Sequence, residues 1–381
     1  MTGLALPAWV TVALFAAAPT ASVALSSPTP WVLEGGVSRH QVRAGERITF
    51  TREAGRLWAH WPGGGAGAGG WSPRGEGPWQ MAAGARTRRL TGRVRLTSAG
   101  PRLEVQASVP LEAYVAGALA SEVPAGTPAA AQEALATCIR SYATRAVGAP
   151  RHAAAALCDA THCLRFATAP PDRHQLAAVR GTEGAVITWR GRPAEAVWHA
   201  ACGGRRAPAQ AAFGGGGAPY LAGGPDRRPN GTPWCGDAPG AAAWRVEMSR
   251  EVVTASLVGA GLWPAGARLE QVRCGRSASD GPVETVRLAG AVTREVPGVA
   301  FWHALGPRLG WRGLRSLTFD VAPTSHGWVA VGRGLGHGVG LCQAGAEARA
   351  RAGHGARAIL AAYYPGTAVS CRRRAGAAPP W

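Results

Sequence analysis

Residues 332–346 read GRGLGHGVGLCQAGA and place a glycine at every second position from 332 to 340. In an extended strand, alternate side chains point to opposite faces. The spacing therefore predicts one face made of hydrogens alone and an opposite face that carries His337 beside a cation and apolar groups. A ligand, a neighbouring backbone or an aromatic ring would each fit against the bare face. The segment predicts a close approach by one of these three, with an imidazole nearby.

A second stretch whose side chains could bind a metal or form a disulfide runs from His152 to Cys163, in the spacing His152-x5-Cys158-x3-His162-Cys163. Two histidines and two cysteines suit a tetrahedral structural zinc site, in which the metal would brace a loop and would not be the catalyst. The alternative is a short disulfide between Cys158 and Cys163, which an oxidising compartment would favour. The two accompanying histidines favour zinc.

The first residues of the chain predict export. Residues 4–18, LALPAWVTVALFAAA, form an apolar run that is short for a membrane span, and Ser22-Val23-Ala24 supplies the small residues that a signal peptidase accepts. The usual positive charges before the run are missing, so an uncleaved anchor is the alternative. We therefore expect residues 1–24 to be a signal peptide or an N-terminal anchor, and the protein to be secreted or held in the cell envelope, outside the cytoplasm.

The composition is strongly basic. The 381 residues carry 41 basic side chains, all of them arginine, and a formal net charge of +19. Such a charge can attract nucleic acid, an anionic membrane or an acidic polymer. The arginines are scattered and no nucleic-acid-binding motif is present. We expect no nucleic-acid partner, and contact with a membrane only through an uncleaved N-terminal segment.

The order of predicted elements is mixed, which favours an α+β fold. Short apolar runs separated by glycine and proline predict a β-rich region over residues 25–108. Apolar residues at helical spacing follow from Val109 and stop before Pro124, and an alanine-rich second helix is expected from about Pro128 to Val147. Further strands are expected at 185–199 and through 331. Shorter helices are expected near 249–259, 342–352 and 356–364.

Eight segments, taken together and in order, indicate a resemblance to one protein family. They are LEAYVAGALASEVP (111–124), CIRSYA (138–143), CDATHC (158–163), WHAACGG (198–204), APYL (218–221), LRSLTFDV (314–321), GRGLGHGVGLCQAGA and ILAAYYPGT (359–367). In this order they resemble the blocks of the SpoIID/LytB family of bacterial cell-wall proteins. The resemblance covers about residues 109–367 and implies a SpoIID-like catalytic region with a cleft, followed by a basic tail at 368–381.

The resemblance implies a lytic transglycosylase that cleaves the MurNAc–GlcNAc bond of peptidoglycan, especially of strands already stripped of stem peptides, and leaves 1,6-anhydroMurNAc ends. The family's catalytic acid falls on Glu122, although Val123 replaces a methionine beside it. One carboxylate can suffice, because the 6-hydroxyl of the sugar itself attacks the anomeric carbon and the same group can give and then take a proton. Partial burial could raise the pKa of Glu122 enough to keep it protonated. Glu112 lies in the first turn of the helix, where we expect a structural role.

The other site residues follow from the matched blocks. Arg140 could hold the lactyl carboxylate or developing charge, and Tyr142 could stack on a sugar. The alternatives are an ion pair and a core aromatic. The two histidines are expected to line one site. The implied catalytic set is Glu122, Arg140, Tyr142, His199 and His337, and the implied substrate-binding set is Gly203, Gly204, Gly336, Gly338 and Gln343.

The chain also departs from the family pattern. Ala200, Ala201 and Cys202 replace serines after His199, and Cys342 replaces the serine before Gln343. Two hydroxyls exchanged for two thiols suggest a disulfide between Cys202 and Cys342, and Cys235 could pair with Cys274. Because the presumed cleft has lost these hydroxyls, a second function remains an alternative: the chain would be a non-catalytic wall-binding protein that enhances an amidase. The expected partners are glycan strands and a cell-wall amidase. No cofactor is expected for catalysis.

Overall fold

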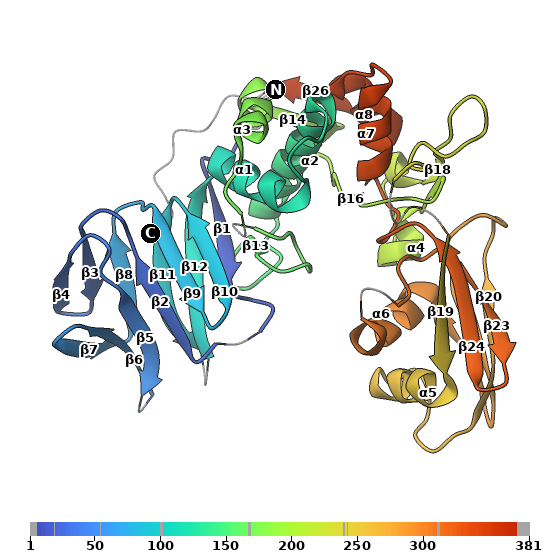
Figure 1. Cartoon of the computed structure of the whole chain (residues 1–381), viewed down its shortest axis with the longest axis horizontal. Helices are drawn as coiled ribbons and strands as arrows, with labels where there is room; N and C mark the ends of the chain where they lie inside the picture. The colour runs from blue at the N-terminus through green and yellow to red at the C-terminus, as the bar shows by residue number, and fades with distance from the viewer. Residues whose placement is uncertain are drawn as a thin grey trace. The chain divides into compact units, whose positions relative to one another are not determined.

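The computed structural model describes residues 6–371 except 19, 54, 100–101, 167–168, 239–240, 242 and 311–312. Helices and strands are mixed along the chain, so the α+β prediction is confirmed (Figure 1). The contacts divide the chain into two units, with unit 1 made of 1–195 and 368–381 and unit 2 of 196–367. This division differs from the predicted one, because β12 (Arg102–Pro110) runs straight into helix α1 (Leu111–Glu122) without a linker.

Unit 1 contains two large sheets. A seven-stranded sheet has the order β13-β1-β12-β11-β8-β3-β4, and a six-stranded sheet has the order β10-β9-β2-β5-β6-β7. Trp71 and Trp79 are fully buried in this β-rich part, and their indole N–H groups donate to the carbonyls of Leu57 and Gly92. The strands not yet bounded are β1 (Trp9–Leu14), β2 (Ser22–Ser26), β3 (Trp31–Gly35), β4 (Ser38–Val42), β5 (Ile48–Glu53), β6 (Arg56–Trp61), β7 (Gly64–Ala68), β8 (Gly70–Arg74), β9 (Trp79–Ala83), β10 (Arg86–Leu90), β11 (Arg93–Ala99) and β13 (Leu157–Cys158).

The segment predicted to be a leader lies inside this fold. Strand β1 pairs with β12 along its whole length and with β13 on its other side, and Val10, Val12 and Leu14 are buried. Cleavage after Ala24 would remove β1 and cut β2 after its third residue. Residues 9–14 thus contribute a strand to the seven-stranded sheet, and the assignment of residues 1–24 as a signal peptide or anchor stays a prediction.

The helical part of unit 1 follows the expected boundaries. Helix α1 begins after Pro110, and α2 (Ala129–Gly148) begins after Pro128. Proline suits the start of a helix because its missing N–H would have no partner there. The side chain of Asp172 caps α3 (Arg173–Gly181). A three-stranded sheet of β15 (Arg192–Pro193), β14 (Ala185–Trp189) and β26 (Ala368–Cys371) completes the unit. The rest of the predicted basic tail, from 372, lies outside the described residues.

Unit 2 has its own core, built around Trp244, Trp328, Phe301 and Phe319. Its sheets are β19-β24-β23, β20-β21-β22 and the pairs β16-β25 and β17-β18. The elements are β16 (Trp198–His199), β17 (Arg205–Arg206), α4 (Ala209–Phe213), the 3-10 turn η1 (Pro219–Leu221), β18 (Gly224–Pro225), β19 (Ala243–Ser249), α5 (Arg250–Gly259), β20 (Leu269–Gly275), β21 (Thr285–Gly290), β22 (Thr293–Pro297), α6 (Gly298–Leu309), β23 (Phe319–Thr324), β24 (Gly327–Arg333), β25 (Leu341–Cys342), α7 (Gln343–Arg351) and α8 (Ala356–Tyr363).

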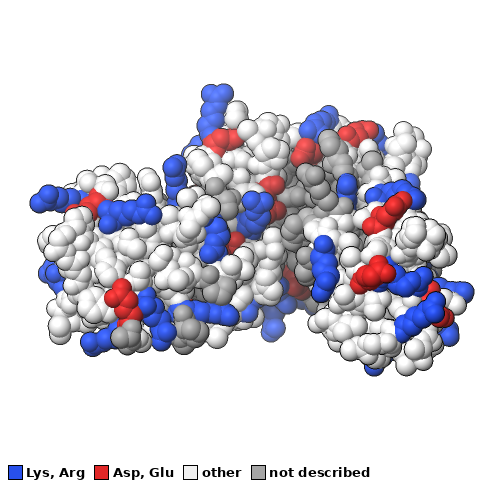
Figure 2. Space-filling model, turned by 60° about the horizontal axis from the view of Figure 1, so that its bottom comes forward, with Lys and Arg blue, Asp and Glu red and all other residues white. Residues whose placement is uncertain are grey.

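The surface carries its positive charge in a dispersed form. On the face shown in Figure 2, arginines are spread widely and acidic side chains lie among them. Among the described helices, none combines the length and the apolar character that a membrane crossing requires.

Candidate functional site

Glu122 is the last residue of α1 and is partly exposed. The neighbouring Leu119 and Val123 are buried. The turn after the helix is fixed by hydrogen bonds: the amide of Val123 donates to the carbonyl of Leu119 at 3.1 Å, and the Gln175 side chain donates to the carbonyl of Val123 at 3.1 Å. Glu122 therefore sits on a rigid support beside apolar side chains, with its carboxylate at a helix end.

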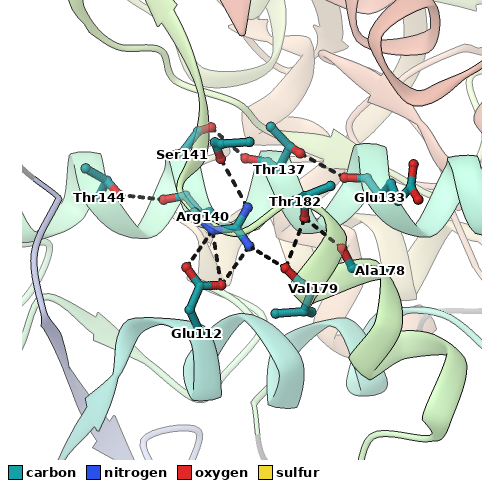
Figure 3. A network of polar contacts seen from close by, with 10 residues as sticks. Glu112, Glu133, Thr137, Arg140, Ser141, Thr144, Ala178, Val179 and Thr182 are labelled. Atoms are coloured by element: carbon teal, nitrogen blue, oxygen red, sulfur yellow. Dashed lines mark hydrogen bonds and ion pairs between the residues drawn. The ribbon is translucent and has the colours of Figure 1, made fainter. Parts of the chain in front are cut away.

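Arg140 is not available to a substrate. Its side chain has no exposed surface, and it forms a two-pronged ion pair with Glu112 through its Nε (2.9 Å) and Nη2 (2.7 Å) atoms (Figure 3). The remaining guanidinium N–H groups donate to the carbonyls of Ala185 and Val179. This ion pair is the arrangement that the sequence left as the alternative. The catalytic role predicted for Arg140 does not fit, because a guanidinium enclosed in this way cannot reach a sugar.

Tyr142 is also a core residue. Only 5% of its surface is exposed, and its hydroxyl donates to the carbonyl of Cys163 at 3.4 Å. The guanidinium of Arg151 lies 4.8 Å from the centre of its ring. Burial raises the pKa of Tyr142. The predicted stacking on a sugar would need an exposed ring face. Tyr142 is therefore the core aromatic that the sequence left as the alternative, and the predicted catalytic role does not fit.

The structure brings together the four side chains predicted to hold zinc. One ligand atom each from His152, Cys158, His162 and Cys163 lies within 4.8 Å of all the others. His152 Nε2 is 3.1 Å from the Cys163 sulfur, and His162 Nδ1 is 3.4 Å from it. A hydrogen bond from the Cys163 thiol lowers the pKa of Cys158. Both cysteines are free, so the alternative disulfide is not formed.

The glycine-rich segment is not the extended strand that its alternation suggests. Strand β24 ends at Arg333, and Gly334, Gly336, Gly338 and Gly340 all have positive φ, between 72° and 97°. Such a backbone strongly favours glycine. The segment packs along residues 197–207, where a Cβ on Gly340 would lie 2.0 Å from the carbonyl oxygen of Val197. Of the three predicted neighbours, two are found: a packed backbone along Gly334 and Gly340, and an aromatic ring, the indole of Trp244, against Gly332.

His199 and His337 lie side by side, with ring centroids 5.7 Å apart. His199 Nδ1 is 3.0 Å from the carbonyl oxygen of Val339, whereas its Nε2 is buried without a hydrogen-bond partner. Burial lowers the pKa of His199 to about 3 and that of His337 to about 4. Both imidazoles are therefore neutral at physiological pH, so neither can donate a proton as an imidazolium.

The residues predicted to bind substrate have structural surroundings. A Cβ on Gly203 would lie 2.8 Å from the Arg333 side chain, and one on Gly204 would lie 2.9 Å from Pro233. Cβ atoms on Gly336 and Gly338 would meet His199 and Ala207 at 3.2 and 3.1 Å. Gln343 is the first residue of α7 and is partly exposed. The four glycines permit tight packing within unit 2.

Two cysteines lie close to His199, a third lies beside one of them, and none of the three forms a disulfide. Cys202 and Cys342 each place a sulfur within 4.8 Å of a His199 ring nitrogen and of each other. The sulfur of Cys235 is 3.7 Å from that of Cys202. The predicted bridges Cys202–Cys342 and Cys235–Cys274 are therefore wrong, because all eight cysteines are free. Sequence spacing gave no signal that Cys235 belongs to this group, since a long irregular segment carries it there.

Asp226 lies next to these thiols, although no motif in the sequence marks it as a member of the group. Its carboxylate is 1% exposed and accepts hydrogen bonds from Arg349 at 2.7 Å and from the hydroxyl of Tyr363 at 2.9 Å. The Cys202 thiol is 3.4 Å from the same carboxylate. The predicted residues thus form two groups: Glu122, Arg140, Tyr142 and the four-ligand loop in unit 1, and His199, His337, the glycines and Gln343 in unit 2.

Two comparisons with known proteins bear on these groups. The family model described as "SpoIID: Stage II sporulation protein" matches residues 100–189, which include α1, α2 and the loop with the four side chains predicted to hold zinc. The chain is also similar to stage II sporulation protein D of Bacillus subtilis (strain 168). The two are 27% identical over 290 residues, which cover 69% of this chain and 75% of that protein.

Proposed function

Because the chain belongs to the SpoIID family, we propose that it acts on the bacterial cell wall as a peptidoglycan lytic transglycosylase, with Glu122 as its general acid and base. The proposed substrate is a glycan strand, and the proposed products carry 1,6-anhydroMurNAc ends. This substrate lies outside the cytoplasmic membrane, so the proposal requires export. The sporulation role named for the relative is one setting in which such an activity would serve.

The observation that carries the proposal is the position of Glu122. Within the matched segment, the carboxylates of Glu112, Asp159 and Asp172 have structural tasks: pairing with Arg140, pairing with Arg88, and capping α3. Glu122 lies partly exposed at the end of α1, beside the buried side chains of Leu119 and Val123. A carboxylic acid in such surroundings can protonate the leaving oxygen and then accept the proton of the 6-hydroxyl.

The proposal includes a structural zinc at His152, Cys158, His162 and Cys163. Their ligand atoms are close enough to surround one ion, and two thiolates with two imidazoles are a set that zinc commonly takes in structural sites. The hydroxyl of Tyr142 donates to the backbone of Cys163 and so ties this loop to α2. Zinc would supply rigidity to the loop, and the proton transfers stay with Glu122.

The test is mass spectrometry of peptidoglycan after incubation with the protein, with and without prior amidase treatment. We expect anhydro-muramic ends from the wild type and none from Glu122→Gln. The matched control is Glu104→Gln, which makes the same chemical change on strand β12 of the same unit and should leave the products unchanged. Equal product release by Glu122→Gln and the wild type would overturn the role of Glu122.

One experimental outcome would support a second function, that of a non-catalytic wall-binding protein. Because Arg140 and Tyr142 are buried, their presence does not favour catalysis over binding. If the wild type binds purified glycan but releases no anhydro ends, and if it accelerates a cell-wall amidase, the chain is a non-catalytic wall-binding protein. Measuring amidase turnover with and without the chain separates the two functions.

A further inference from the structure

We infer that unit 2 contains a second metal site, a zinc centre held by His199, Cys202, Cys235 and Cys342. The inference concerns residues outside the four-ligand loop of unit 1 and does not depend on the proposed transglycosylase activity. It assigns His199 to a metal rather than to a substrate.

The fold brings the four ligands to one point from three separate segments. Strands β16 and β25 pair in parallel with His199 opposite Cys342, and Cys202 follows His199 by three residues. Cys235 comes from the irregular segment between β18 and β19. The four residues are buried. Such convergence inside the core of a unit is typical of a structural metal site, because structural zinc is closed off from solvent by four protein ligands.

One sulfur–sulfur distance has the value expected around a tetrahedral ion, and two further ligand atoms lie close by. With zinc–sulfur bonds of about 2.3 Å, two sulfurs of a tetrahedron lie about 3.8 Å apart. The sulfurs of Cys202 and Cys235 are 3.7 Å apart. The ring nitrogen of His199 and the sulfurs of Cys202 and Cys342 are within 4.8 Å of one another. To complete four bonds, the Cys235 sulfur, which lies beside that of Cys202, would move toward the His199 nitrogen as the group contracts around the ion.

His199 is oriented as a metal ligand. Its Nδ1 lies 3.0 Å from the carbonyl oxygen of Val339, which fixes the proton on Nδ1 and leaves the lone pair on Nε2. That Nε2 atom is buried and has no hydrogen-bond partner in the protein. A buried acceptor without a partner is rare in folded proteins and needs an explanation. A bound cation satisfies it.

Backbone N–H groups support the sulfurs. The sulfur of Cys342 accepts hydrogen bonds from the amides of Cys202 and Gly345, both at 3.3 Å. Cys342 is also the N-cap of α7, where the helix dipole favours a thiolate. A side chain at Gly345 would lie 2.2 Å from the hydroxyl of Tyr363, so this approach of the amide to the sulfur requires glycine.

Asp226 orders the site without being a ligand. Its two oxygens accept hydrogen bonds from Arg349 and Tyr363, and the positive charge of Arg349 offsets its own. The proton that the Cys202 thiol shares with this carboxylate leaves when the sulfur binds a metal. Three thiolates and one imidazole select a soft or borderline ion, and zinc is the usual occupant of a tetrahedral Cys₃His set.

The experiment measures metal in the full-length protein, purified under reducing conditions without chelators. A Cys158→Ser/Cys163→Ser variant removes the unit 1 loop as a metal site, and we expect it to retain one zinc per chain. Adding Cys342→Ser should reduce the content to none, whereas adding the control Cys274→Ser, on strand β20 outside the cluster, should not. Cobalt exchanged for the retained zinc should give the visible spectrum of tetrahedral cobalt and a thiolate charge-transfer band.

A measurement on the wild type covers the case in which a variant fails to fold. Cysteines are alkylated before and after chelation and then mapped by peptide mass spectrometry. We expect Cys202, Cys235 and Cys342 to become reactive only after chelation. The inference is overturned if these cysteines react equally with and without chelator, if two of them are found joined as a disulfide in the reduced preparation, or if the Cys158→Ser/Cys163→Ser variant folds without metal.

Discussion

Replacing Glu112 by alanine should destabilise unit 1 strongly, because it strands the charge of Arg140 in the protein interior. The Arg140 side chain has no exposed surface, and Glu112 supplies the only acidic group paired with it among the described residues. Two backbone carbonyls, of Ala185 and Val179, would remain as acceptors after the change. They can satisfy some N–H groups but cannot neutralise the charge.

The expected magnitude follows from this geometry. Removing one partner of a buried ion pair costs about 3–5 kcal/mol, because the other charge is left uncompensated. The Glu112 side chain is 15% exposed, so water can reach the vacated position and the lower end of that range applies. A double variant, Glu112→Leu with Arg140→Met, removes both charges and should recover most of the lost stability.

The assay is urea unfolding together with hydrogen exchange of the α1 and α2 amides, read by mass spectrometry. A loss of about 3 kcal/mol corresponds to exchange roughly 100-fold faster for amides that open only on unfolding of unit 1. The control is Glu247→Ala, whose ion pair with Arg245 is largely exposed and should contribute under about 1 kcal/mol. If Glu112→Ala costs no more than this control, Arg140 is not held as a buried structural charge and the reasoning fails.

Two further predictions concern backbone positions. Deleting residues 1–24 should leave unit 1 unfolded by circular dichroism, because it removes β1, whose three buried side chains are worth about 1.5–3 kcal/mol each, together with the buried Leu6, Phe15 and Val23; a deletion that melts like the full chain would show that β1 is dispensable. Gly340→Ala should lower the melting temperature of unit 2 more than Gly353→Ala does. Both positions have positive φ, which costs about 1–2 kcal/mol for alanine, but only Gly340 also faces a carbonyl, and equal effects would refute the close approach.

The sequence predicted well those elements that local chemistry determines. Helices α1 and α2 lie where proline and apolar spacing placed them, since proline bars a helix interior and suits its first turn. The four-ligand loop was also predictable, because its side chains are close in sequence and the chain has little freedom to separate them. The α+β class followed from the mixed order of these local signals.

Residues whose environment depends on distant segments were predicted poorly. An arginine on an alanine-rich helix reads equally as a substrate ligand or an ion-pair partner until the position of Glu112, 28 residues earlier, is known. The apolar run at 9–14 resembles a leader in composition, but β12, almost 100 residues later, supplies its pairing partner. The alternating glycines suggested a strand because sequence spacing carries no information on the sign of φ.

The lost hydroxyls of unit 2 can be understood as one coordinated change if the inferred metal binds. Taken singly, thiols in place of two serines of the family pattern suggest a weakened polar cleft. In the structure, however, both thiols lie within 4.8 Å of a His199 ring nitrogen, and the sulfur of Cys235, which lies outside the eight matched segments, is 3.7 Å from that of Cys202. Independent losses would not gather three cysteines beside a buried histidine that has an unpartnered ring nitrogen. Metal content therefore decides whether unit 2 has lost a substrate-binding surface or has gained a structural centre, whichever activity Glu122 proves to have.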